Sequence, residues 1–119
     1  MHSNVSFGQN LTKADSVFSH YFKALKLELS KNKNLDKDRF YFDEIILNNG
    51  KTVFVNKYAN EAIFFFQKLT NINAPAKYIG QSYASFIDRK TLKKWQSWYT
   101  KNKKNIRWCD KEKKIYFIR

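Results

Sequence analysis

The sequence predicts a single small α+β domain with about three helices and two short β-hairpins. Three observations support this class. Two stretches, 12–31 and 88–106, repeat apolar residues at helical spacing; an Asn-Asn-Gly turn separates two β-prone runs; and 119 residues with 43% hydrophobic content are enough for one core. With one Pro and three Gly in the chain, disorder is not expected to dominate.

The first helix is expected between Thr12 and Lys31, with Thr12 or Asp15 as N-cap. Its apolar residues recur every three or four positions: Ala14, Val17, Phe18, Tyr21, Phe22, Leu25 and Leu29. The polar run 31–38 then predicts a surface connection.

A β-hairpin is expected over 39–55, because Asn48-Asn49-Gly50 lies between runs rich in aromatic and β-branched residues. Asn-Gly is typical of a type I′ turn, in which both central residues need positive φ. Asn60 can then cap a helix through Leu69 that is apolar almost all round, which predicts a central position in the fold.

The segment 70–85 contains Pro75 and Gly80 and is expected to be a long loop. Four residues should pin this loop to the core: Tyr78, Ile79, Tyr83 and Phe86. Long loops often carry binding surfaces, so this loop is the first candidate site.

The stretch Asp88–Trp108 carries all three tryptophans and is predicted to organise the domain as a helix, capped by Asp88, that runs into a strand. On a helical wheel, the core-facing side holds Leu92, Trp95, Tyr99 and Ile106, with Trp98 at its margin. Lys90, Lys93, Lys94, Lys101 and Lys104 gather on the opposite side. We expect Trp95 and Trp108 to be structural, and Asn102 to tie the helix end to the strand. A second hairpin is expected between 106–108 and 114–118.

The formal charge of +13 is concentrated in residues 89–119, which hold 12 Lys and Arg against 2 Asp and Glu. Such a field attracts nucleic acid, anionic lipid or an acidic protein. However, Lys outnumbers Arg 19 to 4, and Arg is favoured for bidentate phosphate and base recognition. A merely solvated, soluble surface therefore remains the main alternative.

The residues offer little for catalysis, so we expect a protein that is not an enzyme and holds no cofactor. The only histidines are His2 and His20, and the single cysteine, Cys109, belongs to no metal or redox motif. No set of residues has metal-ligand spacing, and the acidic pairs Asp36/Asp38 and Asp43/Glu44 are interpreted as turn and strand-edge charges. The three glycines are too dispersed for a phosphate-binding loop.

Residues 1–10 are expected to be a flexible leader or signal-peptide remnant that precedes the domain at 11–119. Ser6-Phe-Gly-Gln9 resembles the end of many secretory signal peptides of Bacteroidetes, although no apolar region precedes it here. Two interpretations stay open: a longer, exported precursor with a periplasmic or secreted product, or a chance likeness in a cytoplasmic protein. No stretch approaches 18 apolar residues, so no membrane span is expected.

Three motifs carry a resemblance to a known group: Glu61-Ala-Ile-Phe-Phe-Phe-Gln-Lys-Leu-Thr70, Tyr78-Ile-Gly80, and Trp95-x-x-Trp98-Tyr99-x-x-Asn102-x-x-x-Ile106-x-Trp108. They resemble small uncharacterised secreted proteins of Bacteroidetes. The tryptophan portion is similar to a helix-plus-strand tail that follows HEAT-type repeats in some bacterial proteins. Such proteins usually have Asp where this chain has Cys109. The resemblance implies no activity and no catalytic residue.

By elimination, the sequence favours a non-enzymatic binding module that recognises a protein or a surface polymer and that is exported under the first of the two interpretations of residues 1–10. The alternative is a nucleic-acid-binding protein that uses the basic helix face. The residues proposed for these surfaces are Tyr78, Tyr83, Lys90, Lys93, Lys94, Trp98, Lys101 and Lys104.

Overall fold

The computed structural model describes residues 2–30 and 35–118, with side chains described from residue 13 onward. The helices are α1 (His2–Leu29), α2 (Leu35–Asp38), α3 (Ala59–Thr70) and α4 (Arg89–Asn102). The strands are β1 (Phe42–Ile46), β2 (Thr52–Asn56), β3 (Ala76–Ile79), β4 (Ser82–Ser85), β5 (Ile106–Cys109) and β6 (Lys114–Phe117). Short 3₁₀ turns, Arg39–Tyr41 and Lys103–Asn105, precede β1 and β5.

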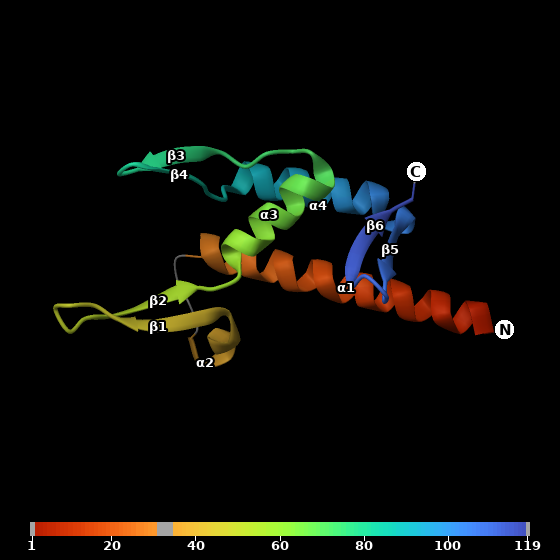
Figure 1. Cartoon of the computed structure of the whole chain (residues 1–119), viewed down its shortest axis with the longest axis horizontal. Helices are drawn as coiled ribbons and strands as arrows, with labels where there is room; N and C mark the ends of the chain where they lie inside the picture. Colours follow the sequence, from red (N-terminus) through yellow and green to blue (C-terminus); the bar gives the residue numbers. More distant parts are fainter. Residues whose placement is uncertain (1, 31–34, 119) are drawn as a thin grey trace.

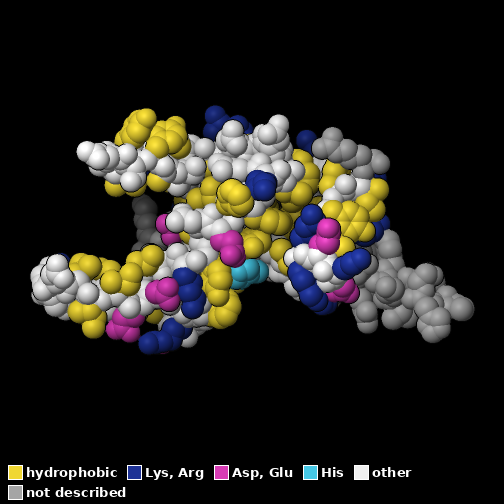
Figure 2. Space-filling view, in the orientation of Figure 1, with side chains coloured by type: hydrophobic (Ala, Val, Ile, Leu, Met, Phe, Trp, Pro, Cys, Tyr) yellow, Lys and Arg dark blue, Asp and Glu magenta, His cyan; other side chains and the backbone are white. Residues whose placement is uncertain are grey.

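Helices α1 and α4 run alongside each other with α3 crossing between them; two of the three antiparallel hairpins extend from this helical body, and the third, β5–β6, lies against α1 (Figure 1). The chain is elongated, with extents of 61 × 29 × 25 Å. At one end the β1–β2 and β3–β4 hairpins project as two separate prongs (Figures 1 and 2). The predicted single α+β domain is confirmed, with one short helix and one hairpin more than expected.

Helix α1 begins at His2 rather than at Thr12, so the predicted beginning of the first helix is wrong. Thr12 and Asp15 therefore lie inside the helix and are not N-caps. No proline interrupts residues 2–29, and the single Gly8 costs only about 1 kcal/mol in a helix interior. Once the amphipathic part of the helix has formed, adding a turn at its end avoids a new nucleation step.

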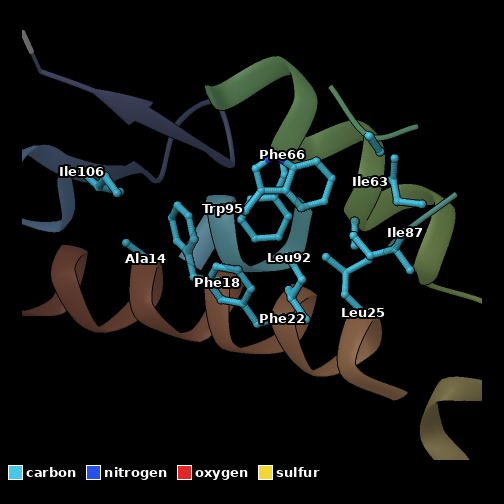
Figure 3. Close-up of a cluster of buried hydrophobic side chains, with 12 residues drawn as sticks. Ala14, Phe18, Phe22, Leu25, Ile63, Phe66, Ile87, Leu92, Trp95 and Ile106 are labelled. Carbon is cyan, nitrogen blue, oxygen red and sulfur yellow. The ribbon is translucent and has the colours of Figure 1, made fainter. Parts of the chain in front are cut away.

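The core is an aromatic stack between α1, α3 and α4, as Figure 3 shows. The Phe18 ring of α1 stacks on Tyr99 of α4, with 4.3 Å between centroids, and lies 5.9 Å from Phe66 of α3. Trp95 is fully buried and stacks on Phe66 at 5.1 Å. Its indole Nε1 donates to the Ile72 carbonyl at 3.0 Å. The predicted organising role of the α4 stretch is thus confirmed at Trp95.

Helix α3 is central, as expected, but it begins at Ala59, so Asn60 is not its cap. Tyr58 holds the N-cap position without a side-chain cap bond, and its backbone N–H donates to Asn56 Oδ1 at 3.1 Å. The helix ends at Thr70, and the following residue, Asn71, adopts the left-handed conformation with φ of 60° and donates its N–H to the Gln67 carbonyl.

The first predicted hairpin is confirmed as β1–β2, but its turn is not type I′. Gly50 is the loop residue with positive φ, at 84°, and its N–H donates to the Leu47 carbonyl, while the Leu47 N–H donates to Lys51. This is a three-residue loop that ends in a left-handed glycine. Asn49 Oδ1 accepts a bond from the Lys51 N–H at 3.0 Å, which stabilises this turn over the expected one.

The segment 70–85 is not a long loop, because residues 76–85 form the β3–β4 hairpin. Its two-residue turn is Gly80-Gln81, and Gly80 has φ of 64°, which suits the first position of a type II′ turn. Pro75 and Gly80 were predicted to interrupt regular structure in this segment. Pro75 instead precedes the first strand, and Gly80 makes the turn between the two.

Asp88 caps α4 as predicted, because its Oδ1 accepts the Thr91 N–H at 2.8 Å. The hydrogen bonds from Thr91 hold the pKa of Asp88 below its ordinary value. The β5–β6 hairpin is also confirmed, with Trp108 opposite Ile115. Asn102 does not tie the helix to the strand, since its amide donates to the Trp98 carbonyl within α4 at 2.8 Å.

Candidate binding surface

The β3–β4 hairpin presents a pair of tyrosines to solvent. Tyr78 and Tyr83 are cross-strand partners, so their side chains lie on the same face of the hairpin. Their ring centroids are 4.8 Å apart, and the two residues are 72% and 66% exposed. Ile79, on the other face, is 61% exposed. The expectation that these residues pin the segment to the core is therefore wrong, because they point into solvent.

The β1–β2 hairpin also carries exposed apolar residues. Its register puts Ile45 and Leu47 on one face together with Val53 and Val55, and Ile46, on the other face, is 71% exposed. Figure 2 shows apolar side chains along both prongs. A two-stranded hairpin is marginally stable in water by itself, so the attachment of each prong to the helical body must contribute to its stability.

The outer face of α4 is basic. Four of the five lysines predicted there lie on α4 and are exposed: Lys90, Lys93, Lys94 and Lys101. Lys104 is exposed too, but it lies in the 3₁₀ turn Lys103–Asn105, because α4 ends at Asn102 and Ile106 begins β5 instead of continuing the predicted helix. Among the residues that the structure describes, none of these five forms an ion pair, and α4 itself contains no Asp or Glu. A shallow hollow of about 370 Å³ is lined by Lys93, Gln96, Ser97, Thr100 and Lys101. This surface combines ammonium, amide and hydroxyl donors, which suit an anionic polymer.

Trp98 does not belong to the exposed basic face. It is half-buried, and its ring packs against Phe117 of β6 with 5.6 Å between centroids. The predicted surface residues therefore separate into a tyrosine pair on the hairpin, a lysine stripe on α4, and one tryptophan that helps hold β6 against the helix.

The residues considered for catalysis are His20 and Cys109. The half-buried His20 lies among aromatic rings, with Nδ1 3.3 Å from the Tyr41 hydroxyl. It lines an open hollow of about 480 Å³ together with Asp15, Ser16 and Ser19. Tyr41 also lines this hollow, and its hydroxyl is the partner of His20; among the described contacts neither Ser16 nor Ser19 is hydrogen-bonded to His20. Cys109 is a half-buried free thiol.

Most of the acidic pairs are used in ion pairs. Asp38 is buried and lies 3.3 Å from Lys23, which fastens α2 to α1. Asp43 pairs with Lys57 and Glu44 with Arg39, each at 3.8 Å. Among the described side chains, those of residues 13–30 and 35–118, no group of three His, Cys, Asp or Glu is placed to hold a metal ion.

The sequence reading missed an apolar groove beside α3, in which Phe64 is 62% exposed. The composition of α3 could have indicated this groove. The helix carries apolar residues almost all round, and α1 and α4 cover only part of its surface.

Comparison of the chain with protein-family models, with curated proteins and with solved structures finds no match. None of the described helices is both long enough and apolar enough to cross a membrane.

Proposed function

We propose that this protein is a non-enzymatic binding module that recognises a protein or a surface polymer through the β3–β4 hairpin. The observation that carries the proposal is the exposed Tyr78–Tyr83 pair, held on one face of a projecting hairpin.

Tyrosine is enriched at recognition surfaces because its ring offers a large apolar contact and its hydroxyl one hydrogen bond. The two rings contact each other, so each restricts the conformations of the other before a ligand arrives. Side chains that are already ordered lose less conformational entropy on binding. The hairpin also has unpaired strand edges, to which an extended segment of a partner can add.

The proposal is tested with immobilised wild type and a Tyr78→Ser/Tyr83→Ser variant. Tyr116→Ser is the matched control, because Tyr116 is an exposed tyrosine on a different hairpin. We expect the immobilised wild type and the Tyr116→Ser control to retain the same ligands, and the double variant to lose them. With the purified ligand, the double variant should raise Kd by about 30-fold, the effect of one hot-spot residue. Equal affinity of all three proteins would reject the hairpin as the recognition element.

The second candidate is a nucleic-acid-binding protein, and the observation that favours it is the exposed lysine face of α4, a helix that contains no Asp or Glu. If five lysines contact phosphates of a single strand, affinity should fall about 100-fold between 50 and 200 mM salt. Binding of mixed DNA and RNA oligonucleotides at these two concentrations, with Lys93→Gln/Lys101→Gln as the test variant, measures this slope. Weak binding without salt dependence excludes this candidate.

Export is part of the first proposal and is motivated by Ser6–Gln9. A periplasmic or secreted location would separate the protein from cellular nucleic acid and so disfavour the second candidate. Fractionation of the source cells, followed by determination of the N-terminus of the native chain, tests it; an intact cytoplasmic chain would argue against export.

A further inference from the structure

An open groove of about 420 Å³ lies between α3, α1 and β6, apart from the hairpin and from the lysine face of α4. Figure 2 views this side of the molecule and shows apolar side chains over α3 next to the β5–β6 hairpin. The apolar lining consists of Tyr21, Phe64, Phe65, Leu69 and Ile115.

The groove exists because α3 has more apolar sides than it has neighbours. Ala62, Ile63 and Phe66 are buried against α1 and α4, whereas Phe64 on the remaining side is 62% exposed. Phe65 forms a fixed part of the wall, since its ring lies 4.6 Å from Tyr21 and 5.4 Å from Phe18. The apolar surface is therefore preformed, which lowers the entropic cost of binding.

The lining of the groove also contains charged groups from two elements. Lys68 of α3 places its Nζ 5.2 Å from the Phe64 ring centroid, and Lys114 of β6 lines the other side. The one carboxylate of the lining, Glu61, already accepts a hydrogen bond from the Tyr21 hydroxyl at 3.1 Å. Lys114 pairs with Glu112 at 3.5 Å, but both side chains are exposed, so this pair is weak. The bond from Tyr21 leaves Glu61 charged, so the two lysines and one carboxylate of the lining give it a net charge of +1.

We propose that this groove binds a small amphiphilic anion, whose apolar body packs on Phe64 and Leu69 and whose head group lies near Lys68 and Lys114. The volume lies in the lower part of the 300–1,000 Å³ range typical of small-molecule sites. Two cations and an apolar floor together select a molecule with a long apolar part and one carboxylate or similar head group.

The test titrates the ¹⁵N-labelled protein with sodium decanoate and follows amide chemical shifts. Decyltrimethylammonium, with the same chain length and a positive head, is the matched control ligand. We expect saturable shifts confined to the amides of α3 and β6 around Phe64, Leu69 and Ile115, with decanoate binding at least about fivefold more tightly than the cation. Shifts spread over the whole chain, or equal binding of both ligands, would overturn the proposal.

Two variants separate the groove from general attraction to a basic protein. Lys68→Gln/Lys114→Gln should weaken decanoate binding about fivefold, whereas Lys93→Gln/Lys101→Gln removes the same charge from α4 and should change it less than twofold. All four positions are exposed, so the variants are expected to fold. Equal effects of the two variants would show that net charge alone attracts the ligand and would refute a site at the groove. The outcome is independent of whether the tyrosine hairpin binds a partner.

Discussion

Replacing Trp95 by alanine removes the side chain that joins the three helices of the core. Trp95 has no exposed surface, stacks on Phe66 and donates a hydrogen bond to the Ile72 carbonyl. The variant therefore leaves a large apolar cavity at the contact of α3 and α4. It also leaves a backbone carbonyl without its partner in the segment that follows α3.

The expected loss has two parts. Truncating a buried Trp to Ala typically costs about 3–5 kcal/mol, and leaving a buried carbonyl unpaired costs about 1–3 kcal/mol where water cannot enter. Because water can partly fill a cavity of this size, we expect a total of about 4–6 kcal/mol. Domains of this kind are stable by about 5–15 kcal/mol, so Trp95→Ala should be largely unfolded or close to it.

If Trp95→Ala does not fold, the milder variant Trp95→Phe still allows the loss of stability at this position to be measured. Phenylalanine preserves most of the stack on Phe66 but cannot donate to Ile72, so it should cost about 1–3 kcal/mol. Guanidinium unfolding followed by far-UV circular dichroism gives both values. Lys93→Ala, on the exposed face of the same helix, is the control and should stay within about 0.5 kcal/mol of the wild type. A cost below about 1.5 kcal/mol for Trp95→Ala would refute the assignment of this residue to the centre of the core.

Three other predictions follow from single contacts. Trp108→Ala should lower the free energy of unfolding by only about 1–3 kcal/mol in the same assay. Trp108 is half-buried, and its Nε1 donates a hydrogen bond to the exposed carboxylate of Asp110. A loss equal to that of Trp95→Ala would contradict this prediction. Asp88→Ala should cost about 1 kcal/mol at neutral pH. Since the pKa of Asp88 is lowered in the folded state, this contribution is present above about pH 3.8 and lost as the pH falls through the folded-state pKa. A stability difference between wild type and Asp88→Ala that stays constant down to pH 2 would contradict this prediction. Burial and the bond to Glu61 raise the pKa of Tyr21 to about 12, so its stabilising contribution is present below pH 10 and lost as the pH rises toward 12. The difference in tyrosinate absorbance between wild type and Tyr21→Phe measures that pKa, and a value near 10 would refute it.

Elements with a strong periodic pattern could be predicted from sequence, and their ends could not. The stripe from Ala14 to Leu29 predicted the buried side of α1, because helical spacing is set by geometry. The same pattern did not predict a beginning at His2, because extension of an existing helix needs no apolar periodicity. Asp88 was predicted as a cap because one carboxylate can satisfy a free N–H locally, without any tertiary contact.

The β3–β4 hairpin was missed because its signal is short and resembles a loop. Gly80 serves equally well in a loop and in a two-residue hairpin turn, and the strands on either side have only four residues each. The positions of the candidate residues were predicted in part. The lysine face of α4 follows from helical geometry, whereas the exposure of Tyr78 and Tyr83 depends on how far the hairpin projects from the body, which depends on tertiary contacts.

The distribution of charge in the fold allows binding tests on the α4 lysines to be distinguished from effects on folding. The carboxylates elsewhere in the described chain are largely engaged: Asp15 accepts from Tyr99, Asp38 pairs with Lys23, and Asp88 caps α4. These contacts contribute to folding, and removing one leaves an unpaired group. Lys93, Lys94 and Lys101 are exposed and form no ion pair among the described residues, so their replacement by glutamine breaks no ion pair and slightly relieves repulsion in a chain of charge +13, whereas Lys90 interacts electrostatically with Asp88. A loss of binding in such variants would therefore report on recognition rather than on unfolding.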